Sequence, residues 1–203
     1  MKARNILIVS IELLCLLSCS KEPQDSPEQH YADTFCGTYY LEKAVWSTDN
    51  IDLNGDGIAN EDLIYEFKNL QGFLENKRFA KIYQNPAAQN EIDVDYYIPY
   101  HDVRKIDNNY YDYGCGYLES SFIGRLDSSN NPKLSFPAKE YNYRDDYNVA
   151  LNGIHKSMIN KFENGTMTIH VDATIYDCDY KPIAGTFYLY FKKISGTTSC
   201  SHR

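Results

Sequence analysis

The stretch TMTIHVDATIY, residues 166–176, decides the fold class because apolar and polar side chains alternate along its whole length. Its apolar set is Met167, Ile169, Val171, Ala173 and Ile175. A period of two residues is that of a β-strand with one buried face. The stretch therefore predicts a strand that packs one side against a hydrophobic core.

Turn residues on both sides of this strand predict an antiparallel meander. GIHKSMINKF at residues 153–162 precedes it, and Asn164-Gly165 between the two segments favours the positive φ angles of a tight hairpin turn. After the strand, residues 177–185 turn the chain again, and TFYLYFKKI at 186–194 alternates in the same way. The C-terminal third is therefore predicted to be an antiparallel meander.

The rest of the chain adds further short strands and a single helix. IDVDYYI at 92–98 alternates, GTYYLEKAVWS at 37–47 is typical of a first strand, and polar clusters such as DNN at 107–109 mark turns. In EDLIYEFKNL at 61–70, apolar residues instead repeat at the spacing of one helical face. Regularly spaced strands with one short helix predict an all-β antiparallel barrel or sandwich.

Composition indicates one acidic domain with no affinity for nucleic acid. The 203 residues carry a formal net charge of −8, and removal of residues 1–18 takes away a net +1 and leaves −9. Such a surface repels nucleic acid and anionic lipid headgroups. The remaining length predicts a single folded domain at 36–195, followed by a tail at 196–203. The 19 tyrosines also favour strands.

The N-terminus has the order of an export signal. Lys2 and Arg4 precede an apolar run at residues 6–17, which is too short for a transmembrane helix. The run ends in Leu-Leu-Ser-Cys, which resembles the lipobox of bacterial lipoproteins. The resemblance implies a signal peptide at 1–18, a diacylated Cys19, and attachment to the bacterial outer membrane or cell surface. The alternative is a plain signal peptide that contains a cysteine.

Residues 19–35 are predicted to be a flexible tether between this lipid anchor and the folded domain. The segment is polar, contains two prolines and has no hydrophobic periodicity. It would hold the domain away from the membrane surface.

Four further cysteines predict disulfides. They are Cys36, Cys115, Cys178 and Cys200. An even number in an exported chain favours disulfides, and the spacing fits neither a zinc site nor a C-x-x-C redox motif. Three pairings are possible, and the sequence does not choose among them.

DLNGDGIANEDL at 52–63 matches the first half of a calcium-binding loop. Such loops place oxygen ligands at positions 1, 3 and 5, a backbone carbonyl at 7 and a carboxylate at 12. Position 12 is Leu63 here, so a calcium shell needs the carboxylate of Asp62 instead. The predicted ligands of a structural Ca²⁺ are Asp52, Asn54, Asp56, the carbonyl of Ile58, and Asp62.

The same loop has an alternative interpretation without an ion. Asp, Asn and Gly favour turns, Asn60 suits a helix N-cap, and Glu61 and Asp62 suit the first turn of a helix. Both interpretations place the loop at the start of the helix. In either case the loop concerns stability more than chemistry.

Several short motifs together resemble the lipocalin-like lipoproteins of gut Bacteroidetes. They are the Gly-x-Tyr opening at 37–39, Trp46, DLNGDG at 52–57, a helix beginning with Asp-Leu, and the aromatic strand near the C-terminus. The resemblance covers most of residues 36–195. It implies an up-and-down β-barrel of about eight strands. No agreed biochemical activity comes with this family.

A barrel of this kind also implies a disulfide pattern. Its first and last strands pair antiparallel, which would bring Cys36 close to Cys200. Cys115 and Cys178 would then form the second bridge.

No sequence motif indicates an enzyme. Gly-x-Ser-x-Gly, His-Glu-x-x-His, phosphate-binding glycine loops and G-x-G-x-x-G are all missing from the sequence. Doubled tyrosines at 39, 96 and 110 either line an opening that binds sugars or apolar ligands, or simply pack the core. We therefore expect a non-catalytic envelope protein that binds a small molecule or glycan.

Two other classes of function remain open at this stage. An interaction or assembly component of a cell-surface complex would have a filled interior and an exposed apolar patch. A glycan-processing enzyme would need carboxylates that converge in a cleft.

Overall fold

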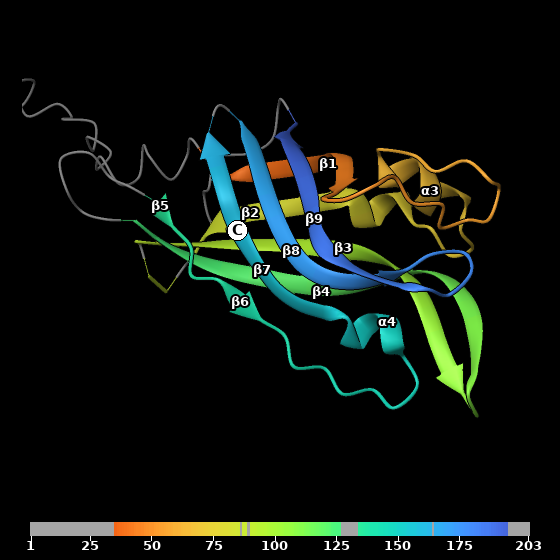
Figure 1. Cartoon of the computed structure of the whole chain (residues 1–203). Coiled ribbons are helices and arrows are strands. Elements are labelled where there is room, and N and C mark those ends of the chain that lie inside the picture. The colour runs from red at the N-terminus through yellow and green to blue at the C-terminus, as the bar shows by residue number, and fades with distance from the viewer. Residues whose placement is uncertain (1–34, 86, 89, 127–133, 164, 195–203) are drawn as a thin grey trace, which may run out of the picture.

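The computed structural model describes residues 35–85, 87–88, 90–126, 134–163 and 165–194 (Figure 1). Its dominant feature is one antiparallel sheet of nine strands that curls into a half-barrel. The strands are β1 (Gly37–Trp46), β2 (Phe79–Gln84), β3 (Glu91–Ile106), β4 (Asn109–Leu126), β5 (Leu134–Ser135), β6 (Lys139–Glu140), β7 (Ile154–Glu163), β8 (Thr166–Tyr176) and β9 (Pro182–Lys193). The predicted all-β, barrel-like antiparallel fold is confirmed.

The first and last strands along the chain, β1 and β9, pair with each other in the sheet. Trp46 lies opposite Phe187, and Tyr39 lies opposite Lys193. The strand order is β5-β4-β3-β2-β1-β9-β8-β7-β6, so β5 and β6 form the two edges. The predicted antiparallel pairing of the first and last strands is therefore confirmed, and the sheet is open at a different place.

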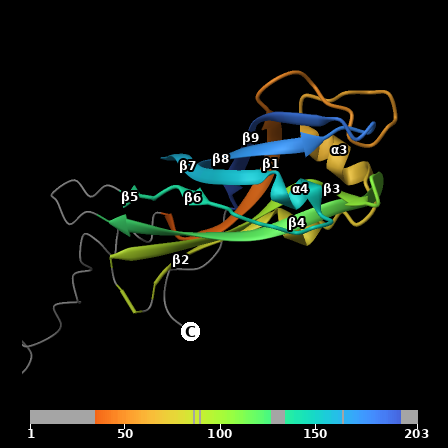
Figure 2. The same ribbon diagram turned by 60° about the horizontal axis from the view of Figure 1, so that its bottom comes forward.

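The open seam lies between β4 and β7, and the segment from β5 to β6 lies across it (Figure 2). Phe136 of this segment packs its ring 6.2 Å from that of Phe122 on β4. The Tyr141 hydroxyl lies 2.5 Å from Ser120 Oγ on β4 and 2.7 Å from Ser157 Oγ on β7. Side chains of this segment therefore join the two sides of the seam.

The inner face of the curled sheet forms the hydrophobic core. The alternating set Met167, Ile169 and Val171 of β8 is fully buried, as predicted from the sequence. Tyr39 of β1 and Tyr96 of β3 belong to the same core. Because each large apolar side chain contributes roughly 1.5–3 kcal/mol on burial, this face stabilises the fold.

The helix α3 (Leu63–Asn69) confirms the prediction from apolar spacing. Leu63, Phe67 and Leu70 are all buried, so the predicted face is the one that packs on the sheet. The side chain of Asp62, and not that of Asn60, caps the N-terminus by accepting a hydrogen bond from Ile64 N.

Two short helical segments have no periodic signal in the sequence. They are the 3-10 helix η1 (Glu75–Arg78), which leads into β2, and the helix α4 (Val149–Asn152), which leads into β7. In the ranges that the structure describes, no helix has the length and hydropathy needed to cross a membrane.

The described chain begins and ends at one side of the sheet. Ile194 N donates to the carbonyl of Thr38 at 2.9 Å, which places the end of β9 beside the start of β1. The tip of the β3–β4 hairpin, where Asp107 and Asn108 adopt positive φ angles as the predicted turn requires, lies at the opposite side (Figure 1). The first and last described residues therefore lie far from this tip.

Candidate functional site

The predicted calcium loop connects β1 to α3 and is closed by a bridge between Ile51 and Asn60. Both carboxylate oxygens of Asp52 accept backbone hydrogen bonds, from Gly55 N at 2.6 Å and from Gly57 N at 2.8 Å. Gly55 and Gly57 have φ angles of 75° and 83°, which suit glycine. The aspartate at position 1 therefore shapes the backbone of the loop.

Asn54 and Asp56 continue this pattern. Asn54 Oδ1 accepts from Asp56 N at 2.9 Å, and Asp56 Oδ1 accepts from Ile58 N at 2.8 Å. The carbonyl of Ile58 accepts a longer bond, 3.3 Å, from Asn60 Nδ2. These bonds agree with the turn interpretation and do not test for an ion, so calcium binding stays a prediction.

Asp62, which the sequence predicts as a calcium ligand, accepts hydrogen bonds from two backbone amides. Its Oδ1 accepts from Ala44 N on β1 at 2.9 Å and from Ile64 N on α3 at 3.1 Å. Asp62 thus ties the helix start to the first strand. Across the described residues, no group of three or more His, Cys, Asp and Glu side chains is arranged to hold a metal ion.

Glu66, on α3, is the carboxylate that lies at the centre of the loop. It is 0% exposed, and its Oε2 accepts from Leu53 N at 3.0 Å and from Asn54 Nδ2 at 2.9 Å. Its Oε1 accepts from Asn60 Nδ2. Within the described part of the chain, no Lys or Arg forms an ion pair with it. Backbone and side-chain amides of the loop therefore provide the hydrogen bonds of a buried carboxyl group.

The predicted Cys115–Cys178 disulfide is wrong, because both thiols are free. The backbone anchors the two cysteines to different places. Cys115 N, on β4, donates to the carbonyl of Gln71 after α3, whereas Cys178 N, after β8, donates to that of Asp52 in the loop. Burial raises the pKa of the Cys115 thiol to about 11.

The other cysteine predictions concern residues that lie in part outside the described ranges. Cys36 is buried just before β1, but Cys200 and the lipidation candidate Cys19 are not among the described residues. The Cys36–Cys200 pairing and the lipid anchor therefore stay predictions.

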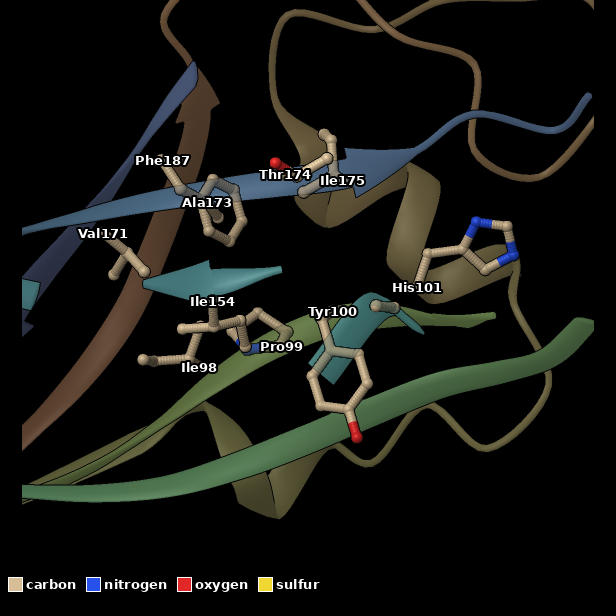
Figure 3. A pocket seen from close by; sticks show the side chains of 11 residues that line it. Ile98, Pro99, Tyr100, His101, Ile154, Val171, Ala173, Thr174, Ile175 and Phe187 are labelled. Atoms are coloured by element: carbon tan, nitrogen blue, oxygen red, sulfur yellow. The ribbon is translucent and has the colours of Figure 1, made fainter. Parts of the chain in front are cut away.

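Between β3, β8 and β9, the described residues almost fill the inside of the half-barrel. Figure 3 shows the hollow between β3, β8 and β9, where Ile98, Val171 and Phe187 line a volume of about 10 Å³. A single water molecule needs about 10–15 Å³ of such space. This hollow therefore holds no organic ligand.

His101 lies at the edge of this hollow, with its ring turned away from the apolar side chains (Figure 3). Its Nδ1 donates to the carbonyl of Tyr176 at 2.9 Å, and its Nε2 lies 3.2 Å from Asp112 Oδ1. The neighbouring Asp102 pairs with Arg104 instead, at 3.1 Å. His101 therefore contacts Asp112 and not its neighbour in sequence, Asp102.

The outer face of the sheet, in contrast, is hollowed beside η1. A hollow of about 250 Å³ lies over β2, β3 and β4. The residues that line it are Asn76, Lys77, Phe79, Lys81, Asp95, Tyr97 and Glu119, together with Tyr96, whose side chain is buried. Aromatic surface and charged groups of both signs therefore meet in one concave site.

A second, shallower depression of about 430 Å³, largely open to solvent, adjoins the first at Phe79, which lines both. Its other lining residues are Tyr40, Glu42, Lys192, Lys193 and Ile194, from β1 and the end of β9. We call the two hollows together the outer groove. The groove crosses the strands from β4 through β3 and β2 to β1 and β9.

Tyr40 lines the second hollow, with its ring 5.3 Å from that of Phe79, and is held by two neighbouring side chains. Its hydroxyl donates to Glu75 Oε1 at 2.5 Å, and the Arg78 guanidinium lies 4.2 Å from its ring centroid. Arg78 is itself buried and donates twice to the carbonyl of Leu41, at 3.1 and 2.6 Å. Burial and the contact with Glu75 raise the pKa of Tyr40, so its hydroxyl stays protonated and continues to donate.

The charged groups of the groove are partly paired. Lys77 Nζ lies 3.9 Å from the centroid of the Tyr97 ring, and Asp95 accepts a hydrogen bond from Tyr83 at 2.8 Å. Glu42 lies 3.4 Å from Lys192 Nζ. The groove therefore offers aromatic surface with donors and acceptors already oriented.

No protein-family model, curated protein or solved structure matches this chain. Membership of the lipocalin-like lipoproteins therefore rests on the sequence motifs alone and stays a prediction.

Proposed function

We propose that this protein is a non-catalytic binding protein of the bacterial cell envelope that holds a small molecule or glycan in the outer groove. The observation that carries the proposal is the contrast in open volume. The interior hollow has about 10 Å³, and the two outer hollows have about 250 and 430 Å³. Binding sites for small ligands typically have volumes of about 300–1,000 Å³.

The lining of the groove supports binding more than catalysis. Ligand sites combine aromatic surface with a few well-placed polar groups, as Phe79 and Tyr97 do with Asp95 and Glu119. A rigid aromatic side chain such as Tyr40 loses little conformational entropy when a ligand binds. Pre-ordered contacts of this kind favour affinity.

Binding is tested by a thermal-shift screen of metabolites and glycans on the wild-type protein and on Phe79→Ala. A ligand of the groove should raise the melting temperature of the wild type and have little effect on the variant. Tyr111→Ala, at the tip of the β3–β4 hairpin, is the matched control and should respond as the wild type does. A ligand that stabilises Phe79→Ala fully would contradict the proposal.

The lipid anchor at Cys19 is part of the same proposal. Its support is the lipobox-like end of the signal sequence and the polar tether that follows. The wild type should enter the detergent phase of a membrane extract, and Cys19→Ala should remain in the aqueous phase. A variant that still enters the detergent phase would exclude lipidation at Cys19.

A structural Ca²⁺ at the loop is a further part of the proposal, and buried Glu66 supports it. Among the described residues the carboxylate forms no ion pair with Lys or Arg, and its bonds to Leu53 N and Asn54 Nδ2 hold it against the loop that carries Asp52 and Asp56. Hard cations prefer such oxygen ligands. Calcium at millimolar concentration should raise the melting temperature of the wild type but not that of Asp52→Asn. An unchanged melting temperature of the wild type would contradict calcium binding.

The alternative function is that of a component of a surface complex. It is favoured by exposed tyrosines at and beside the tip of the β3–β4 hairpin. Tyr111, Tyr113 and Tyr147 are 44%, 49% and 59% exposed. If the protein has this function, the double variant Tyr111→Ser/Tyr113→Ser should dissociate from its complex. A native gel of solubilised membranes would show the release. Phe79→Ala would not.

A further inference from the structure

We infer that the occupant of the outer groove is a neutral oligosaccharide whose chain crosses the strands from Tyr97, past Phe79, to Tyr40. This inference rests on the proposed function and adds the chemical class, charge and length of the ligand. It follows from the charge balance of the groove, its aromatic residues and the way in which the two hollows adjoin.

The charge balance disfavours an ionic ligand. Lys77 and Lys81 in the first hollow are matched by Asp95 and Glu119. In the second hollow, Glu42 is paired with Lys192, and Lys193 adds one further positive charge. A strongly anionic ligand would meet a carboxylate in either hollow, and a strongly cationic one would meet a lysine, which costs binding energy in both cases.

The lining fits a ligand that has apolar faces and a polar rim. A pyranose ring presents C–H groups on its faces and hydroxyl groups around its edge. Phe79, between Tyr40 and Tyr97, provides apolar surface for such faces. Hydroxyl groups both donate and accept, so they can bond to Glu119 and to Lys81 without a net charge.

Lys77 provides a contact that a sugar can replace. The side chain is half-buried, and its Nζ lies over the Tyr97 ring. Cation–π contacts at such accessible sites are weak. A sugar ring would take the place of the ammonium group, which would then turn to donate to a hydroxyl.

The length of the ligand follows from the shape of the groove. Each hollow has its own polar rim, and Phe79 is common to both. A single sugar would occupy one hollow and leave the other empty. An extended chain would use both, so affinity should rise with chain length until both hollows are filled.

The test is an array of neutral and anionic oligosaccharides of increasing length, probed with the mature protein in detergent and followed by calorimetry. We expect binding to neutral chains and tighter binding of longer ones. Tyr97→Ala should weaken binding by about tenfold or more. Glu119→Gln alters only an exposed side chain and should also weaken binding. Tyr111→Ala, the matched control, should bind as the wild type does.

Other outcomes separate this inference from the proposed function. The protein could bind only anionic glycans, peptides or apolar molecules and lose this binding in Phe79→Ala. That result would overturn the inference of a neutral oligosaccharide and keep the groove as the binding site. No binding anywhere on the array would also overturn it. If neither Phe79→Ala nor Tyr97→Ala changes glycan binding, the outer groove is not the binding site, and the proposed function is contradicted. Shorter glycan products, lost in Glu119→Gln, would show catalysis and contradict a non-catalytic role.

Discussion

Two pairs of adjacent tyrosines show how differently the two faces of the sheet are used. Tyr39 and Tyr96 point inward and are 1% and 0% exposed, whereas Tyr40 and Tyr97 line the outer groove. Successive side chains of a strand point to opposite faces, so each of these two pairs contributes one ring to the core and one to the surface. The same residue type therefore stabilises the fold on one face and offers a binding surface on the other.

The surroundings of the inner and outer rings explain this difference. Tyr96 stacks on Phe122 at 5.4 Å, and its hydroxyl lies 2.9 Å from Ser157 Oγ across the seam. Burial raises the pKa of Tyr96 far above its usual value. Tyr97 instead has a lysine over its ring and lies open to the groove. Substitutions at these two positions should separate stability from binding.

The largest expected effect is on stability, at the inner tyrosine. Tyr96→Ala removes a fully buried ring and its hydroxyl contacts and should lower the free energy of unfolding by about 3–5 kcal/mol. Tyr97→Ala should lower it by less than about 1 kcal/mol. Urea denaturation followed by circular dichroism measures both values. Similar losses for the two variants would contradict the division between the faces.

A smaller loss of stability is expected when two carboxylates near the loop, the buried Glu66 and the exposed Glu61, are compared in the same way. Glu66→Ala leaves buried amide groups without their acceptor and should cost about 1–3 kcal/mol. Glu61, whose side chain is exposed and paired with Lys43, should contribute little when changed to Ala. The same denaturation measurement applies. A Glu66→Ala protein as stable as the wild type would show that this carboxylate is not the centre of the loop.

The smallest expected effect, with no change in stability, concerns the two free thiols. Cys115 has a pKa of about 11, so only about one molecule in a thousand carries its thiolate at pH 8. Iodoacetamide at pH 8 should therefore label half-buried Cys178 before buried Cys115, and labelling of Cys115 should increase as the pH rises. Mass spectrometry of peptides gives the extent of labelling. Labelling of Cys115 before Cys178 at pH 8 would contradict this order of reactivity.

Local periodicity predicts individual strands and the helix, but not the number of strands or the open seam of the sheet. Alternation in residues 166–176 identified β8, and alternation in residues 92–98 placed Tyr96 among the buried set and Tyr97 opposite to it. The spacing of Leu63 and Phe67 identified α3. These features depend on neighbours a few residues apart, which is why the sequence shows them.

The site depends on contacts that join distant segments. The outer groove exists because η1, which has no periodic signal, places Lys77 and Arg78 beside β1 and β3. Glu66 lies beyond the loop in sequence and reaches it only because α3 folds back under it. Its signal was a charged residue one turn after Asp62, next to the buried helical face.

The central claim is that ligand binds outside the half-barrel and not within it. An NMR titration of the mature protein with the tightest-binding glycan of the array tests this most directly. We expect signals of Tyr40, Phe79 and Tyr97 to shift in a saturable way, while those of the core residues Val94 and Ile169 stay in place. Saturable shifts at Val94 and Ile169, with the groove signals unmoved, would contradict it.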